Sequence, residues 1–112
     1  MDIRELLQIP GVLPTDPGDN RVLVVDDDLS LRMSMVRALR REGYDCHAAT
    51  STAEARHELR RGHYGLVITD LRMFAEDGIE LVREVSDRYR NTYSIVVSGF
   101  VTDDDADRIR RA

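Results

Sequence analysis

The residues of this chain whose types and spacing could do chemistry are acidic, and they follow two short aliphatic runs. Three aspartates at 26–28 come directly after the run at 22–25, and Asp70 follows the run at 66–69. Unbroken aliphatic runs flanked by helical patterns predict parallel strands that are covered on both faces. Acids at the carboxyl ends of such strands lie in the crevice where open α/β sheets bind ligands. Because crowded carboxylates repel one another unless a divalent cation neutralises them, the pattern predicts a Mg²⁺ site that handles phosphate.

Composition narrows the class of protein. At 112 residues the chain is long enough for one domain with a modest core. The net charge of −5, with no basic face, argues against nucleic-acid binding. No apolar run is long enough to cross a membrane, so we expect no membrane association. The lone cysteine, Cys46, excludes an internal disulfide and favours the cytoplasm, and we expect it to be at least half-buried.

The order of elements predicts an α/β fold. Residues 1–20 contain three prolines and two glycines and are interpreted as a leader or linker. From residue 21 to residue 112, apolar runs alternate with helical patterns as βαβαβαβα. Such alternation predicts right-handed crossovers and a parallel sheet. Strands are expected at 21–25, 44–49, 65–69 and 93–97, and the half-polar second strand is expected at an edge.

Helix signals follow each strand. Leu31, Met35 and Leu39 repeat at helical spacing and predict a core-facing stripe, with Met33 as near-core filler and a glycine at 43 as the C′ residue. Residues 51–54 have the spacing of a capping box at the start of the second helix. Asp77 and Gly78 are expected to open the third helix and to serve as a turn and cap. Thr102 is expected to cap a final helix.

Four segments, taken together, resemble the receiver domain of bacterial two-component response regulators. They lie at 22–28, 67–73, 77–78 and 96–99, in the order and spacing of that family. The resemblance implies a flavodoxin-like doubly wound sheet with strand order 2-1-3-4-5. It also implies a phosphoprotein that receives a phosphoryl group from a sensor histidine kinase or a phosphotransfer protein. Such a domain is a signalling switch and not an enzyme, apart from slow self-dephosphorylation.

The resemblance also implies roles for individual residues. Asp70 matches the phosphoacceptor, Asp27 a direct Mg²⁺ ligand, and Asp26 its partner acting through water. The backbone carbonyl of Arg72 falls where the family supplies a third protein ligand, and Ser98 matches the hydroxyl that turns toward the phosphoryl group. Phosphoryl transfer needs positioning and charge neutralisation more than a strong nucleophile, which suits a carboxylate. Mg²⁺ prefers oxygen ligands and retains several waters.

Two features depart from the family pattern. Phe74 stands where the family usually has proline, which predicts a looser loop after the acceptor. All 16 basic residues are arginine, so the family's lysine is absent from this chain. We expect that lysine, the fifth strand and the last helix to lie beyond Ala112, which leaves a four-stranded sheet of order 2-1-3-4. The exposed edge of the strand at 93–97, or the final helix at about 103–112, would then favour a homodimer.

Two other functions are compatible with the same residues. A receiver-like interaction module that no longer takes phosphate is one alternative. A haloacid-dehalogenase-type phosphatase is the other, with Asp26 as nucleophile and Asp28 as general acid. Asp28 is otherwise expected to be a helix cap. The three histidines show no metal-ligand spacing and are expected on the surface: His47, His57 and His63.

Overall fold

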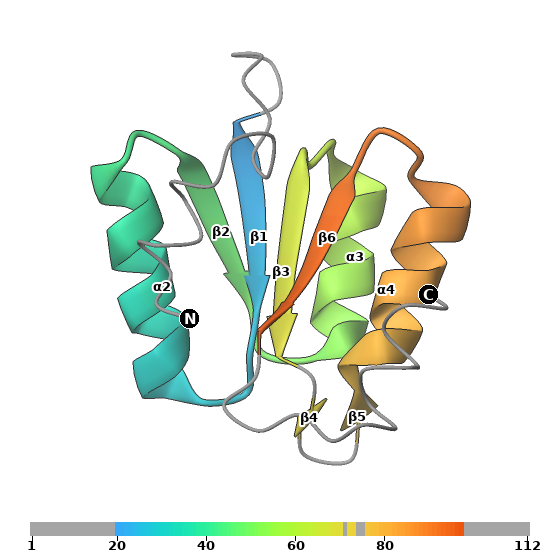
Figure 1. The fold of residues 1–112 in the computed structure, drawn as a ribbon, viewed down its shortest axis with the longest axis horizontal. Coiled ribbons are helices and arrows are strands. Elements are labelled where there is room, and N and C mark those ends of the chain that lie inside the picture. The colour runs from blue at the N-terminus through green and yellow to red at the C-terminus, as the bar shows by residue number, and fades with distance from the viewer. Residues whose placement is uncertain (1–19, 71, 74–75, 98–112) are drawn as a thin grey trace.

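A parallel four-stranded sheet forms the centre of the computed structural model, which describes residues 20–70, 72–73 and 76–97. The sheet has the order β2-β1-β3-β6, with every neighbouring pair parallel (Figure 1). Its central strands are β1 (Arg21–Val25) and β3 (Leu66–Asp70), and its outer strands are β2 (Asp45–Ala49) and β6 (Tyr93–Val97). The predicted order 2-1-3-4 is therefore confirmed.

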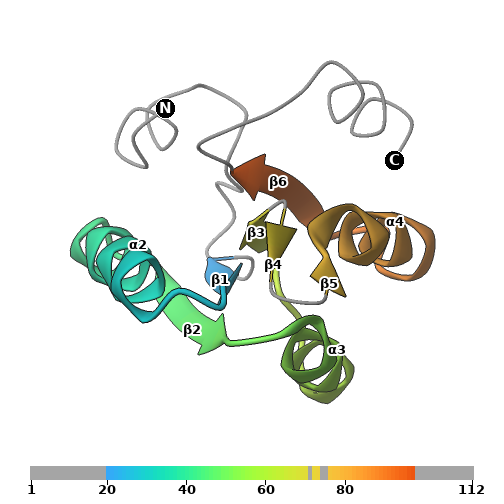
Figure 2. The same ribbon diagram turned by 90° about the horizontal axis from the view of Figure 1, so that it is seen from below.

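Helices cover both faces of the sheet, as the doubly wound prediction requires. Helix α2 (Leu29–Arg41) lies on one face, whereas α3 (Thr52–Arg61) and α4 (Gly78–Arg88) lie on the other (Figure 2). Each face has its own apolar cluster. The cluster on the side of α3 and α4 contains Leu23, Val25, Ala49, Ala55, Leu59, Tyr64, Val67, Leu81 and Val85. The cluster on the side of α2 contains Val22, Val24, Val36, Leu39, Cys46, Leu66 and Ile68.

Burial explains the composition of the strands. The aliphatic residues of β1 and β3 alternate between the two clusters, so both faces of these central strands must be apolar. The outer strand β2 is only partly buried, with Asp45 exposed and Cys46 buried. Burial raises the pKa of the Cys46 thiol to about 11, which keeps it protonated and unreactive at neutral pH. The predicted edge position of this strand and the predicted burial of the cysteine are confirmed.

The helix ends follow the predicted signals. Asp28 is the N-cap of α2, and its carboxylate accepts a hydrogen bond from the Leu31 amide at 3.1 Å. Gly43, just past the end of α2, has φ of 92°, a conformation that glycine adopts without strain. Ser51 caps α3 by accepting a hydrogen bond from the Glu54 amide at 3.1 Å.

Three details of the prediction were wrong. Leu31 is 55% exposed and Met33 is 39% exposed, so neither belongs to the core. The loop after β3 contains a small antiparallel pair, β4 (Arg72–Met73) and β5 (Glu76–Asp77). Strands of two residues are too short to show a pattern in the sequence, so this pair was not predicted.

Other expectations are settled only in part. His57 and His63 are exposed as predicted, whereas His47 is half-exposed and lies 3.2 Å from the Asp45 carboxylate. Among the described residues, no helix is long and apolar enough to cross a membrane. The expectations for 1–19, Phe74 and 98–112, including Ser98 and the final helix, lie outside the described residues.

Candidate functional site

The register of the two central strands brings the acidic residues together. Val25 of β1 lies opposite Thr69 of β3. The next residue on each strand is an aspartate, so Asp26 follows β1 beside Asp70 at the end of β3. Parallel strands end at the same edge of a sheet, and these acids therefore meet at its carboxyl edge.

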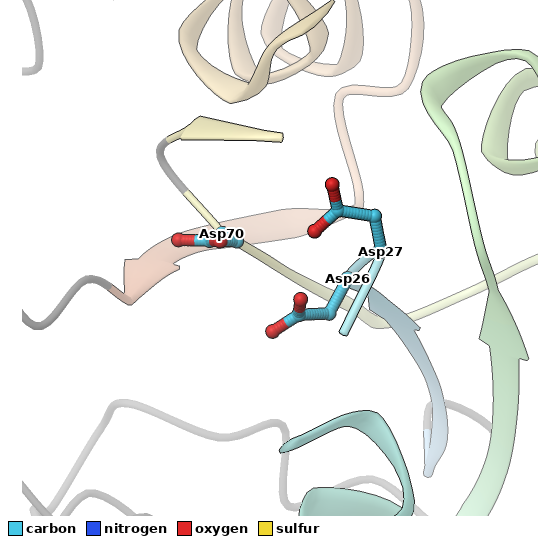
Figure 3. A group of neighbouring side chains, drawn as sticks. All are labelled: Asp26, Asp27 and Asp70. Atoms are coloured by element: carbon cyan, nitrogen blue, oxygen red, sulfur yellow. The ribbon is translucent and has the colours of Figure 1, made fainter. Parts of the chain in front are cut away.

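Three of the predicted site residues form one cluster in space. Asp26, Asp27 and Asp70 each offer a carboxylate oxygen, and these oxygens all lie within 4.8 Å of one another. Figure 3 shows the three side chains together at the ends of β1 and β3. Asp26 is buried, Asp27 is exposed, and Asp70 is intermediate. The cluster thus has a buried base and an opening to solvent.

Burial gives Asp26 an unusual carboxyl group. It is 2% exposed, and desolvation is the largest cause that raises its pKa above the ordinary value of 3.8. A hydrogen bond from the Asp28 backbone amide to its Oδ1, at 2.9 Å, opposes that shift by stabilising the carboxylate. The negative charges of Asp70, Asp27 and Asp28 raise the pKa further. A positive charge nearby would offset both the desolvation penalty of the Asp26 carboxylate and its repulsion by the other acids.

The segment that carries two of the acids is tied down at several points. The Asp26 amide donates to the Ala49 carbonyl at 3.2 Å, and the Arg32 amide donates to the Asp28 carbonyl at 3.0 Å. Asp28 directs its own carboxylate at the start of α2, which confirms that it acts as a cap. This arrangement leaves Asp26 and Asp27 as the two acids of the triplet that reach the cluster.

Two further residues shape the site through contacts that the sequence did not predict. An added Cβ at Gly78 would collide with the Asp70 carbonyl oxygen and approach Thr69 Oγ1 to 3.2 Å. Only glycine therefore lets the start of α4 pack against the end of β3. Arg32 donates from Nη1 to the Asp26 carbonyl at 2.9 Å. Neither contact has a local signal in the sequence. Gly78 lies eight residues after Asp70, and Arg32 is one arginine within a helical pattern.

The donor set suits Mg²⁺. Carboxylate oxygens are the hard ligands that this ion prefers, and opposite oxygens of its octahedron lie about 4.2 Å apart. The carboxylate oxygens, which all lie within 4.8 Å of one another, are spread over a comparable span. The buried, crowded state of Asp26 gives a physical reason for a cation here.

The remaining predicted site residues stay predictions. Arg72 pairs with Asp77 between β4 and β5, and the role of its carbonyl as a ligand is untested. Val97 lies opposite Asp70 in the sheet, and Ser98 follows it in the sequence, outside the described residues.

The sequence and the fold both match known proteins. The family model of the response regulator receiver domain matches residues 22–112. The chain is 35% identical over 65 residues to the transcriptional regulatory protein BasR of Escherichia coli, a match that covers 58% of this chain and 29% of BasR. The matched part is thus less than a third of that relative.

Solved structures agree with this assignment. A response regulator receiver protein from Pseudomonas putida is 36% identical, with a TM-score of 0.76 over 83% of this chain and 78% of the other. The response regulator TrrA from Thermotoga maritima, in complex with Mg²⁺-BeF, is 31% identical, with a TM-score of 0.68 over 71% of this chain and 70% of the other. Since the family model covers most of the sequence and the fold agrees, the chain belongs to the response regulator receiver domain family.

Proposed function

We propose that the chain is a phosphorylation-controlled switch in which Asp70 is the phosphoacceptor. The observation that carries the proposal is the cluster of three carboxylates whose ligand oxygens lie within 4.8 Å of one another. A sensor histidine kinase or a phosphotransfer protein would supply the phosphoryl group from a phosphohistidine. A carboxylate oxygen of Asp70 forms the new P–O bond, the P–N bond to the histidine breaks, and the leaving imidazole nitrogen takes a proton.

Differences in burial support Asp70 as the nucleophile. Asp70 is partly exposed at the end of β3, whereas Asp26 is 2% exposed and accepts a hydrogen bond from the Asp28 amide. A phosphoryl donor therefore has readier access to Asp70. The phosphatase alternative requires Asp26 as nucleophile and Asp28 as general acid, but Asp28 caps α2. This geometry favours a phosphoacceptor over the phosphatase.

Asp26 and Asp27 would hold Mg²⁺, together with the Arg72 carbonyl and an oxygen of Asp70. When bound, the ion supplies positive charge that offsets the negative charge of the acids and of the incoming phosphoryl group. TrrA, the Thermotoga relative, was solved in complex with Mg²⁺-BeF, which supports Mg²⁺ as the ion. Asp26 and Asp27 would orient Asp70 because all three acids would hold the same ion. The buried Asp26 forms the base of this acidic cluster.

Ser98 would complete the switch. Its hydroxyl would turn toward the phosphoryl group, and the following helix would change its surface. The family's lysine has no counterpart among the residues of this chain.

We propose that the domain works in the cytoplasm and only slowly hydrolyses its own phosphoryl group. We also propose a homodimer through the edge of β6 or through the predicted final helix that follows Thr102. A monomer at all concentrations by light scattering would contradict the dimer.

A test of the phosphoacceptor uses a small phosphodonor and Mg²⁺. Intact-protein mass spectrometry should show one added phosphoryl group on the wild type and on Asp87→Asn, a control on the exposed face of α4. Asp70→Asn should lose the modification entirely. Full labelling of Asp70→Asn with loss in Asp26→Asn would contradict the assignment and favour the phosphatase. No response of the wild type to Mg²⁺ or to the donor would favour a module that acts only through protein contacts.

A further inference from the structure

We infer that Arg32 is a positioning residue for the acidic cluster, because it fixes the peptide group that joins Asp26 to Asp27. This inference rests on the proposed function, since it concerns how the chain prepares its site for Mg²⁺. Arg32 would touch neither the ion nor the phosphoryl group. It would act on the direction in which the acids point.

The hydrogen bond of Arg32 goes to a part of the backbone that controls a ligand. Arg32 Nη1 donates to the Asp26 carbonyl oxygen at 2.9 Å. That carbonyl belongs to the planar peptide between Asp26 and Asp27, so holding it also holds the nitrogen of Asp27. The rest of Asp26 is held by the Ala49 carbonyl and the Asp28 amide. Arg32 therefore restricts one of the two peptide planes that flank Asp27 and so limits where Asp27 points.

The anchor is rooted in a rigid element. Arg32 lies four residues after the N-cap Asp28, and its own amide donates to the Asp28 carbonyl at 3.0 Å. The side chain thus reaches back from the start of α2 to the loop before it. A cation at this end of a helix is disfavoured by the helix dipole, which the N-cap Asp28 offsets without help from an acid in the first turn of α2. The acid-bearing loop supplies a reason for an arginine in this place.

The choice of acceptor matters for a cation-binding site. A guanidinium paired directly with the carboxylates would compete with Mg²⁺ for them. The bond of Arg32 goes to a backbone carbonyl instead, so a bound ion would leave it intact. The charges that shift the Asp26 pKa come from Asp70, Asp27 and Asp28. Arg32 is thus placed to organise the acids without neutralising them.

This role predicts the sign of a mutational effect. Removing a positive charge near an acidic site strengthens cation binding if the charge acts only through its field. Removing the anchor of the Asp26–Asp27 peptide weakens binding, because the ligands must then be ordered when the ion binds. The two explanations therefore predict opposite changes in Mg²⁺ affinity.

The chain offers a matched control on the same helix. Arg40 donates from Nη2 to the Cys46 carbonyl at 3.0 Å, far along α2 from the acids. Arg32→Met and Arg40→Met each remove one charge and one bond to a backbone carbonyl. In the full chain, Mg²⁺ titration followed by backbone amide NMR should show about tenfold weaker binding for Arg32→Met and unchanged binding for Arg40→Met. The melting temperatures of the two variants should fall by similar amounts.

Each other outcome has a defined meaning. If Arg32→Met binds Mg²⁺ as tightly as Arg40→Met, or more tightly, the positioning role is wrong. If Arg32→Met fails to fold, the comparison of Arg32→Gln with Arg40→Gln replaces it, and Arg32→Gln should still bind more weakly. Arg32→Lys, which keeps a donor on a long stem, should recover part of the affinity. If the wild type itself shows no Mg²⁺ response, the proposed function fails and this inference fails with it.

Discussion

At the scale of single residues, the ionisation of Asp26 opposes folding. Its folded-state pKa lies above the ordinary value of 3.8, chiefly because of burial. Between the unfolded-state pKa and the raised pKa, the folded protein binds more protons than the unfolded chain does. The free energy of unfolding therefore falls as the pH rises through that window. The site is thus built at the expense of stability, as catalytic and binding sites often are.

Replacing Asp26 with asparagine tests this at neutral pH without metal. Asparagine keeps an oxygen for the Asp28 amide and loses the buried charge. Thermal unfolding followed by circular dichroism should show Asp26→Asn more stable than wild type at pH 7, by on the order of 1 kcal/mol. The difference should shrink in acid, where the wild-type carboxyl is protonated in both states. Equal stabilisation by Asp87→Asn on exposed α4 would show that the effect is only one of net charge.

Gly78 supports the second acid of the cluster by its lack of a side chain. A Cβ here would collide with the Asp70 carbonyl, so Gly78→Ala must move the end of β3 or the start of α4. We expect a loss of about 1–3 kcal/mol in the free energy of unfolding, by urea denaturation, and slower phosphorylation. Alanine normally favours a helix over glycine by about 1 kcal/mol, so a loss is diagnostic. Ser86→Ala, exposed on α4, is the control; a stabilised Gly78→Ala would contradict the crowding.

At the scale of elements, the two helix caps test whether Asp28 is a metal ligand. Asp28 caps α2 and Ser51 caps α3 through the same kind of hydrogen bond, each at 3.1 Å. Asp28→Ala and Ser51→Ala should each lower the free energy of unfolding by about 1 kcal/mol. Both should leave Mg²⁺ affinity within about twofold of wild type, by NMR titration. A tenfold loss of Mg²⁺ affinity in Asp28→Ala, with none in Ser51→Ala, would contradict this expectation. If Asp28→Ser did not restore that affinity, Asp28 would be a ligand.

The elements that the sequence predicts most clearly are the strands that are buried on both faces. The strands β1 and β3 are apolar on both sides because both sides face a cluster, and this makes their runs unbroken. Because these two strands end at the same edge of the sheet, their runs predict that Asp26 and Asp70 lie together. The half-polar composition of β2 indicated an edge strand, and the strand is only partly buried. The residue patterns therefore predicted the strands and the acidic cluster, whereas the sheet order was implied by the family resemblance.

What the sequence could not predict depends on contacts between distant segments. The collision that requires Gly78 involves the Asp70 backbone, and no local pattern reports it. The reach of Arg32 back to the Asp26 carbonyl depends on the angle at which α2 leaves its loop. The helical spacing that Leu31 shares with the buried Leu39 does not report that Leu31 is 55% exposed. The short pair of β4 and β5 is too brief for any periodicity.

At the scale of the whole molecule, the acidic cluster couples metal binding to folding. The chain carries a net charge of −5, and three of its acids meet at one edge of the sheet. An ion that binds only the folded state stabilises it by mass action. Because binding requires deprotonated carboxylates, the stabilisation should depend on pH through the acid whose pKa is raised.

We therefore expect Mg²⁺ to raise the melting temperature, and to raise it more at pH 7 than at pH 5. At ten times its dissociation constant, the ion should add about 1.4 kcal/mol to the free energy of unfolding. The control is sodium chloride at equal ionic strength, because screening of the net charge also stabilises the fold. Asp27→Asn, which removes the exposed ligand of the cluster and leaves the buried Asp26 in place, should lose most of the Mg²⁺ effect and keep the salt effect. Equal shifts with sodium and magnesium, or a larger shift at pH 5, would show that the three acids do not form a divalent-cation site.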